Sequence, residues 1–187
     1  MGKAASAPIF SPTAGTYDTP QKVSITASTP GSTIQYSADG TIPNESLVSV
    51  YDGTEITVDM PLTLAAIATR SDLSNSIVSI VSYNFKCATP TFIPGTTSNT
   101  WTMNSVTPNA VIRYTLDGSN PTIESTEYIG VAIIQGMMPV KTIAIRTGWA
   151  SSNIVTSSTA PSVSITANPA LVNNSSSFTA VVNDDDS

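Results

Sequence analysis

A ten-residue stretch that occurs twice constrains the fold of this chain more than any other feature. Residues 34–43 read Ile-Gln-Tyr-Ser-Ala-Asp-Gly-Thr-Ile-Pro, and residues 112–121 read Ile-Arg-Tyr-Thr-Leu-Asp-Gly-Ser-Asn-Pro. Their tyrosines, Tyr36 and Tyr114, are 78 residues apart (114 − 36), and Asp, Gly and Pro recur at the same offset. An alternating run that ends in Asp-Gly predicts a strand entering a tight turn, because glycine accepts positive φ without a Cβ clash. Its recurrence predicts two copies of one unit.

Short alternating segments surround both stretches. In the first copy we expect a turn at 15–18, a polar loop at 41–50, and strands at 23–28, 33–37, 55–58, 62–69 and 77–85. In the second copy we expect strands at 100–106, 112–115, 131–134, 142–146 and 154–156. Pro, Gly and β-branched residues interrupt every stretch that could form a helix. Units of about 75–80 residues with roughly seven short strands predict an all-β fold of two tandem immunoglobulin-like β-sandwiches.

The repeat also sets the expected domain organisation. We expect a leader at 1–7, immunoglobulin-like repeat 1 at 8–86, repeat 2 at 87–158, and a partial third domain or tail at 159–187. The last segment holds two β-type runs that resemble the start of a third, different immunoglobulin-like domain. Three alternatives stay open for it: a third domain that is cut short, a flexible tail, or a strand pair donated to a neighbour's sheet edge.

Composition limits the class of partner. Of 187 residues only 11% are charged, the formal net charge is −6, and Lys and Arg together number 7. Phosphate binding needs clustered cations, so we expect no nucleic-acid partner. No run approaches the roughly 18 apolar residues of a membrane span, so we expect no membrane insertion. A low-charge chain rich in Ser, Thr and Asn is typical of extracellular, cell-surface or virion β-proteins.

The N-terminus has no apolar stretch of the kind a signal peptide carries. We therefore weigh two readings of it. The chain is either a piece of a longer secreted protein or a protein that leaves the cell without a signal peptide, as phage structural proteins do.

The inventory of reactive side chains is small. The chain has no histidine, which removes Ser-His-Asp and Cys-His nucleophile systems and every metal site that needs histidine. The single cysteine, Cys87, cannot form an intrachain disulfide; it is either a buried small residue or a thiol for an intermolecular bridge or reaction. Asp39 and Asp117 precede Gly40 and Gly118 in the two turns, where an aspartate side chain bonds its own backbone. We expect these four residues to be structural, and we expect no catalytic residue, metal or cofactor.

The repeated strings resemble a known family. They are Tyr-x-x-Asp-Gly-x-x-Pro in both copies, Tyr-Asp-Gly at 51–53, Ala-Ile-Ala-Thr-Arg at 66–70 with Leu73, and Ile-Ala-Ile-Arg at 143–146 with Gly148 and Trp149. The likeness covers about residues 8–157 and is to the immunoglobulin-like repeats at the C-terminus of chitobiase and β-hexosaminidase, with the related fibronectin III-associated modules of bacterial surface proteins. It implies accessory domains without catalytic residues. The first copy departs from the pattern, because Asp72 stands where the second has Gly148 and its loop at 46–50 is longer.

Four aromatic residues are candidate ligand or partner contacts: Trp101, Trp149, Tyr51 and Tyr128. An aromatic face packs on the apolar side of a sugar ring as it packs on other apolar groups. For Trp149 the alternative is a packing role, since it occupies the position of Leu73 in the first copy.

The main expectation is a non-catalytic structural or attachment module of an extracellular or virion surface, for example a phage decoration or tail component. Such a module has protein partners or assembles with itself on a larger surface. The alternative is a carbohydrate-associated accessory region of a secreted glycoside hydrolase, with carbohydrate as the ligand.

Overall fold

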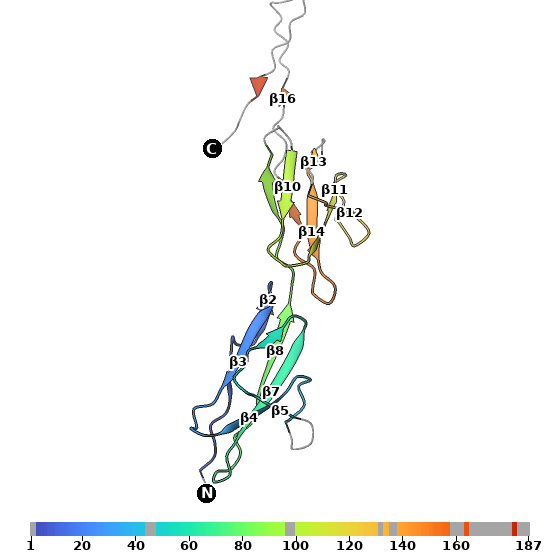
Figure 1. Cartoon of the computed structure of the whole chain (residues 1–187). Helices are drawn as coiled ribbons and strands as arrows, with labels where there is room; N and C mark the ends of the chain where they lie inside the picture. The colour runs from blue at the N-terminus through green and yellow to red at the C-terminus, as the bar shows by residue number, and fades with distance from the viewer. Residues whose placement is uncertain are drawn as a thin grey trace, which may run out of the picture. The chain divides into compact units, whose positions relative to one another are not determined.

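The computed structural model describes residues 3–43, 48–95, 100–130, 133–134, 138–157, 163–164 and 181–182. These residues form β-strands and connecting turns, with no helix among them (Figure 1). The all-β prediction is therefore confirmed.

The first repeat forms two sheets. The smaller has the order β1-β3-β6, with β1 at Ile9–Ser11, β3 at Gln21–Thr26 and β6 at Ile56–Val58. The larger has the order β2-β8-β7-β4-β5. Its strands are β2 (Gly15–Tyr17), β8 (Ser79–Phe85), β7 (Leu62–Thr69), β4 (Thr33–Ser37) and β5 (Ser49–Val50). All pairings are antiparallel except β2 with β8, which is parallel.

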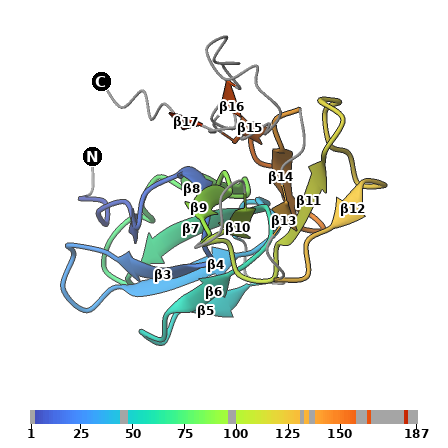
Figure 2. The same cartoon turned by 90° about the horizontal axis from the view of Figure 1, so that it is seen from above.

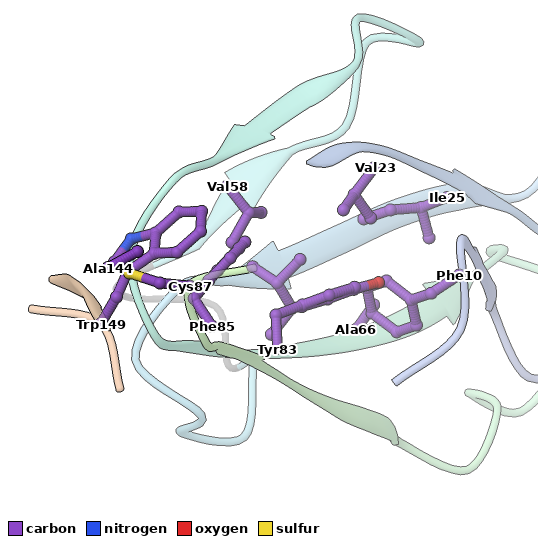
Figure 3. Packing of buried hydrophobic residues seen from close by; sticks show 11 residues of the cluster. Phe10, Val23, Ile25, Val58, Ala66, Tyr83, Phe85, Cys87, Ala144 and Trp149 are labelled. Atoms are coloured by element: carbon purple, nitrogen blue, oxygen red, sulfur yellow. The ribbon is translucent and has the colours of Figure 1, made fainter. Parts of the chain in front are cut away.

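The core of this sandwich comes from alternate residues of both sheets (Figure 3). Val23 and Ile25 of β3 alternate with exposed or half-exposed neighbours, which is the period-2 pattern of a strand with one buried face. Leu64 and Ala66 of β7 and Tyr83 of β8 are buried on the other sheet. Their burial against one another holds the two sheets together.

The second repeat also forms two sheets. One has the order β13-β10-β9, with β13 at Ile133–Ile134, β10 at Thr100–Asn104 and β9 at Thr91–Pro94. The other has the order β12-β11-β14-β15, and β12 lies beside β11 in Figure 2. Its four strands are β12 (Thr126–Glu127), β11 (Val111–Thr115), β14 (Lys141–Ile145) and β15 (Val155–Thr156).

Contacts divide the chain into two compact units that do not follow the repeat boundaries residue by residue. Unit 1 comprises residues 1–89 together with 105–111 and 144–153, and unit 2 comprises 90–104, 112–143 and 154–187. Thus two loop segments from the second half of the sequence belong to the body of unit 1.

Several strand bounds differ from the expectation by one or two residues, and three differences in the first repeat have a visible cause. The predicted turn at 15–18 contains the parallel strand β2, and the predicted loop at 41–50 ends in β5, which pairs with β4. The strand expected at 77–85 begins only at Ser79, because Ser76 hydrogen-bonds Ala68 and holds the chain in a turn. Two expected segments are described only in part. Residues 46–47 of the 46–50 loop and residues 131–132 of the strand expected at 131–134 lie outside the described residues.

The C-terminal segment is described only at β16 (Val163–Ser164) and β17 (Val181–Val182), which pair antiparallel. This pairing agrees with the expected two β-type runs. The rest of residues 159–187 lies outside the described residues.

Candidate functional site

The two Asp-Gly turns have the same geometry. Asp39 accepts hydrogen bonds from the backbone N–H of Thr41 at 3.0 Å and from its hydroxyl at 2.6 Å, and Gly40 has φ +77°. The hydroxyl and the N–H of Thr41, in that order, hold the pKa of Asp39 below its usual value. A carboxylate engaged in this way fixes the turn that ends the strand.

The second turn repeats these contacts with a serine. Asp117 accepts from the N–H of Ser119 at 3.0 Å and from its hydroxyl at 2.6 Å, and Gly118 has φ +81°. The same two donors, hydroxyl first, lower the pKa of Asp117.

A shallow hollow of about 390 Å³ lies beside this second turn, at the end of β11 in unit 2. Its lining residues are Tyr114, Thr115, Leu116, Asp117, Ser125 and Thr126. Tyr114 is half-buried, while Leu116 is 43% exposed. An aromatic ring, an exposed aliphatic side chain and several hydroxyls are the groups that a sugar ring can contact, because its faces are apolar and its rim is hydroxylated.

Local hydrogen bonds fix the walls of the hollow. Thr115 donates its hydroxyl to the carbonyl of Ser119 at 2.6 Å. On the opposite wall, the hydroxyl of Ser125 accepts from the N–H of Thr122 at 2.9 Å, and the carbonyl of Ser125 accepts from Arg113 at 3.0 Å. These hydrogen bonds hold the two loops that line the hollow.

Trp149, one of the predicted contact residues, lies in the core of unit 1. It is 7% exposed, its ring lies 4.5 Å from that of Phe85 between centroids, and Figure 3 shows the two side by side. Its Nε1 donates to the carbonyl of Asp59 at 2.9 Å. This placement corresponds to the packing alternative, in which Trp149 fills the position of Leu73.

Arg146 completes this cluster. Its guanidinium lies 4.1 Å from the Trp149 ring centroid and pairs with the carboxylate of Asp59 at 2.6 Å. The Arg146 side chain is only 10% exposed, whereas that of Asp59 is 48% exposed. Its Nη1 is buried and has no hydrogen-bond partner among the described residues. A buried arginine that pairs with one carboxylate and packs on an indole is a rigid structural contact.

The other three predicted contact residues are half-buried and lie in different places. Tyr51 belongs to unit 1 and meets Tyr36 edge to face, with centroids 6.3 Å apart. Trp101 belongs to β10 in unit 2 and meets Phe92 edge to face at 5.6 Å. Tyr128 follows β12 in unit 2, where its N–H donates to the carbonyl of Ile112. The structure does not bring the four aromatic residues together.

Cys87 is buried beside this Trp149 cluster at 3% exposure (Figure 3). Burial raises the pKa of its thiol, although the backbone and charge of Arg146 act in the opposite direction. A thiol with a raised pKa is mainly protonated near neutral pH and is a weak nucleophile.

Sequence reasoning missed the hollow and the partners of Trp149. The equivalence of Arg70 with Arg146 was visible as a repeat, but Asp59 lies 87 positions before Arg146 and no local pattern connects the two. The described residues contain no group of three or more His, Cys, Asp or Glu side chains that could hold a metal. In the same part of the chain, no helix is long and apolar enough to cross a membrane.

Two β-sandwich repeats, each with an Asp-Gly turn and with the same strand order apart from the added β2 in the first, define a tandem immunoglobulin-like protein. The model of the chitobiase/beta-hexosaminidase C-terminal domain matches residues 12–80 and again residues 94–157. The chain therefore belongs to that family, whose members are non-catalytic accessory modules of the kind found in glycoside hydrolases. This confirms the resemblance seen in the repeated strings.

Among solved structures, the chain is similar to the fibronectin(III)-like modules of CbhA from Clostridium thermocellum. The identity is 17%, the match covers 80% of this chain and 90% of that chain, and the TM-score is 0.32. No curated protein matches the chain.

Proposed function

We propose that this chain is a non-catalytic, carbohydrate-associated accessory region of a secreted protein, and that the unit 2 hollow contacts the polysaccharide. The observation that carries the proposal is the family match over both repeats. The chemistry of the hollow supports it, because Tyr114 and Leu116 offer apolar contact beside several hydroxyls. The turn carboxylates are held by their own backbone and serve structure.

The main expectation from the sequence is a structural or attachment module of an extracellular or virion surface, based on the tandem units, the low-charge composition and the lack of histidine. The family match supports the accessory role better. We therefore keep the virion-surface role only as an outcome of the experiment below.

The test is depletion of the full chain from solution by insoluble chitin and by cellulose. We expect retention on at least one of them, reduced by Tyr114→Ala by about three- to tenfold, because the variant removes the aromatic face. Ile129→Ala is the matched control, since Ile129 is 78% exposed in the same unit and does not line the hollow.

Equal loss in the two variants would contradict a site in the hollow. Absence of retention, together with ordered multimers in gel filtration, would support the virion-surface role instead. Glycoside turnover that Asp117→Asn abolishes would overturn the non-catalytic assignment.

A further inference from the structure

Two loops of unit 1 share the same backbone hydrogen bonds, although Gly148 has φ +79° and the equivalent Asp72 does not have a positive φ. We call residues 70–76 the Leu73 loop and residues 146–152 the Trp149 loop. In each, the N–H of the fourth residue donates to the carbonyl of the first, at 3.0 Å in the Leu73 loop and 3.1 Å in the Trp149 loop. In each loop, the hydroxyl of the last serine accepts a hydrogen bond of 2.9 Å from a backbone N–H of a strand. The N–H of Ala68 donates to Ser76, and the N–H of Ala144 donates to Ser152.

A chain segment runs parallel to each loop with the same hydrogen bonds. At the Trp149 loop, Cys87 donates to the carbonyl of Ala150 at 2.8 Å, and Ala150 donates to that of Phe85 at 2.9 Å. At the Leu73 loop, Ala5 donates to the carbonyl of Ser74 at 2.9 Å, and Ser74 donates to that of Lys3 at 3.2 Å.

The correspondence extends one residue further along each segment. Ala88 donates its N–H to the hydroxyl of Thr107, and Ser6 donates its N–H to that of Thr29, both at 2.8 Å. Residues 3–6 therefore lie on the Leu73 loop as residues 85–88 lie on the Trp149 loop.

The side chains of the two loops have different partners. At the Trp149 loop, Arg146 and Trp149 both bond Asp59, and the indole packs on Phe85. These partners come from the end of the first sandwich: Asp59 directly follows β6, and Phe85 ends β8.

At the Leu73 loop no such sandwich end is present among the described residues. Arg70 instead turns back to Asp72 of its own loop, with contacts at 2.6 and 2.8 Å, and to the carbonyl of Pro30 at 2.7 Å. Leu73 is only half-buried, and the Asp72 side chain is 62% exposed. An ion pair so exposed contributes little to stability, so Arg70 can exchange it for another carboxylate.

We propose that the Leu73 loop is a docking surface for the end of another immunoglobulin-like unit of this family. The last strand of the incoming unit would lead into residues 3–5, as β8 leads into residues 85–87. The unit would offer an aspartate to Arg70, as Asp59 meets Arg146, and an aromatic side chain to Leu73, as Phe85 meets Trp149. Docking at the Leu73 loop would be weaker than the contact at Trp149, because a leucine side chain has no N–H to donate to a carbonyl.

The third residue of each loop differs in backbone conformation. Gly148 has φ +79°, which favours glycine, and a Cβ there would also meet the terminal methyl of Met60, a flexible side-chain end that can move aside. The Leu73 loop has Asp72 at that position without a positive φ. An incoming unit with a small or flexible side chain in place of Met60 would fit against Asp72.

In the experiment, a copy of residues 8–86 is placed directly before Ala5, so that its last residue takes the place of Ala4. The rate of thiol labelling is then measured at Leu73→Cys in the original first repeat. Both the extended and the unextended chain carry Cys87→Ala, so that the introduced cysteine is the only thiol. Alanine is chosen because Ala5 occupies the position at the Leu73 loop that Cys87 occupies at the Trp149 loop. We expect labelling of Cys at 73 to slow by about tenfold or more in the extended chain, because a docked surface is reached only through local opening. Ser119→Cys, in an exposed turn of unit 2, should label at the same rate in both chains.

Arg70→Glu in the extended chain should restore fast labelling at 73, since it repels the incoming carboxylate. Equal labelling rates at 73 in the two chains, with the added copy folded by circular dichroism, would overturn the proposal. Slow labelling that depends on protein concentration in the unextended chain would assign the surface to a second copy of this chain and would also overturn it. None of these outcomes depends on polysaccharide retention by unit 2.

Discussion

At the scale of single residues, Tyr83 shows how burial makes stability depend on pH. Its side chain is fully buried, its hydroxyl donates to the carbonyl of Pro12 at 2.7 Å, and burial together with the nearby Tyr17 raises its pKa to about 12. The unfolded chain releases this proton near pH 10. The folded state therefore keeps its advantage below pH 10 and loses it as the pH rises toward 12.

We predict that the free energy of unfolding falls by roughly 2 to 3 kcal/mol between pH 10 and 12 on account of Tyr83. Tyr83→Phe should remove this part of the pH dependence, at a cost of about 1 kcal/mol at pH 7 for the lost hydrogen bond. Urea unfolding at several pH values measures both quantities. Parallel pH profiles for the two proteins would contradict the assignment.

At the scale of elements, a buried serine hydroxyl completes the bonding at the end of a strand. The hydroxyl of Ser152 accepts from the N–H of Ala144 in β14 and donates to the carbonyl of Asn153 at 2.8 Å. In the first repeat, Ser76 makes the same contacts with Ala68 and Ile77. The side chain replaces a backbone partner that the turning chain cannot supply.

We predict that Ser152→Ala lowers the free energy of unfolding by about 1 to 3 kcal/mol, because a buried N–H loses its acceptor. The control is Ser82→Ala on β8, whose hydroxyl pairs with Thr63 at an exposed position where water replaces it. Chemical denaturation of the two variants makes the comparison. A larger effect at Ser82 than at Ser152 would be inconsistent with this role.

Sequence patterns predicted those elements whose residues alternate or whose turns need glycine. The bounds of β4 and β7 agree with the expectation, because β4 leads directly into the Asp-Gly turn and β7 contains the apolar run 64–68. β2 and β5 were not predicted: β2 has three residues in a parallel pairing with a distant strand, and β5 has two residues on a sheet edge. Short strands of this kind form because a partner is present, and their own sequence carries no signal.

The candidate site was less predictable than the fold. The aspartates of the two turns could be placed from sequence because their hydrogen bonds are local. Trp149 could be aligned with Leu73, but its burial depends on Asp59 and Phe85, which are distant in sequence. The hollow beside Tyr114 depends on a loop whose path is set by Arg113, and no motif marks it.

At the scale of the whole molecule, the chain passes back and forth between the two units, and we expect this to couple their unfolding. Segments 105–111 and 144–153 belong to unit 1, while the chain on either side of them belongs to unit 2. Unit 1 therefore cannot lose these segments without disturbing strands of unit 2. Trp149 supplies the largest side chain of the 144–153 segment and is 7% exposed.

We predict one unfolding transition for the full chain and two for Trp149→Leu, which substitutes the residue of the first copy. The substitution should lower the free energy of unfolding by about 2 to 4 kcal/mol, since it removes buried aromatic area and one hydrogen bond. In Trp149→Leu, Trp101 is the remaining tryptophan and its fluorescence follows unit 2, while circular dichroism follows the whole chain. Trp101→Phe is the control, because it leaves the Trp149 contacts intact; circular dichroism and Trp149 fluorescence should show a single transition for it.

The likeness of the Leu73 and Trp149 loops has a mechanical consequence. Both loops carry the same backbone hydrogen bonds, so the force needed to separate a docked segment depends on the side chains that each loop presents. The Trp149 loop, with an indole and a nearly buried arginine, should resist tension better than the Leu73 loop, with a leucine and a half-buried arginine. A protein assembled from such repeats can thus vary its stiffness from joint to joint by point substitution, without any change to its sheets.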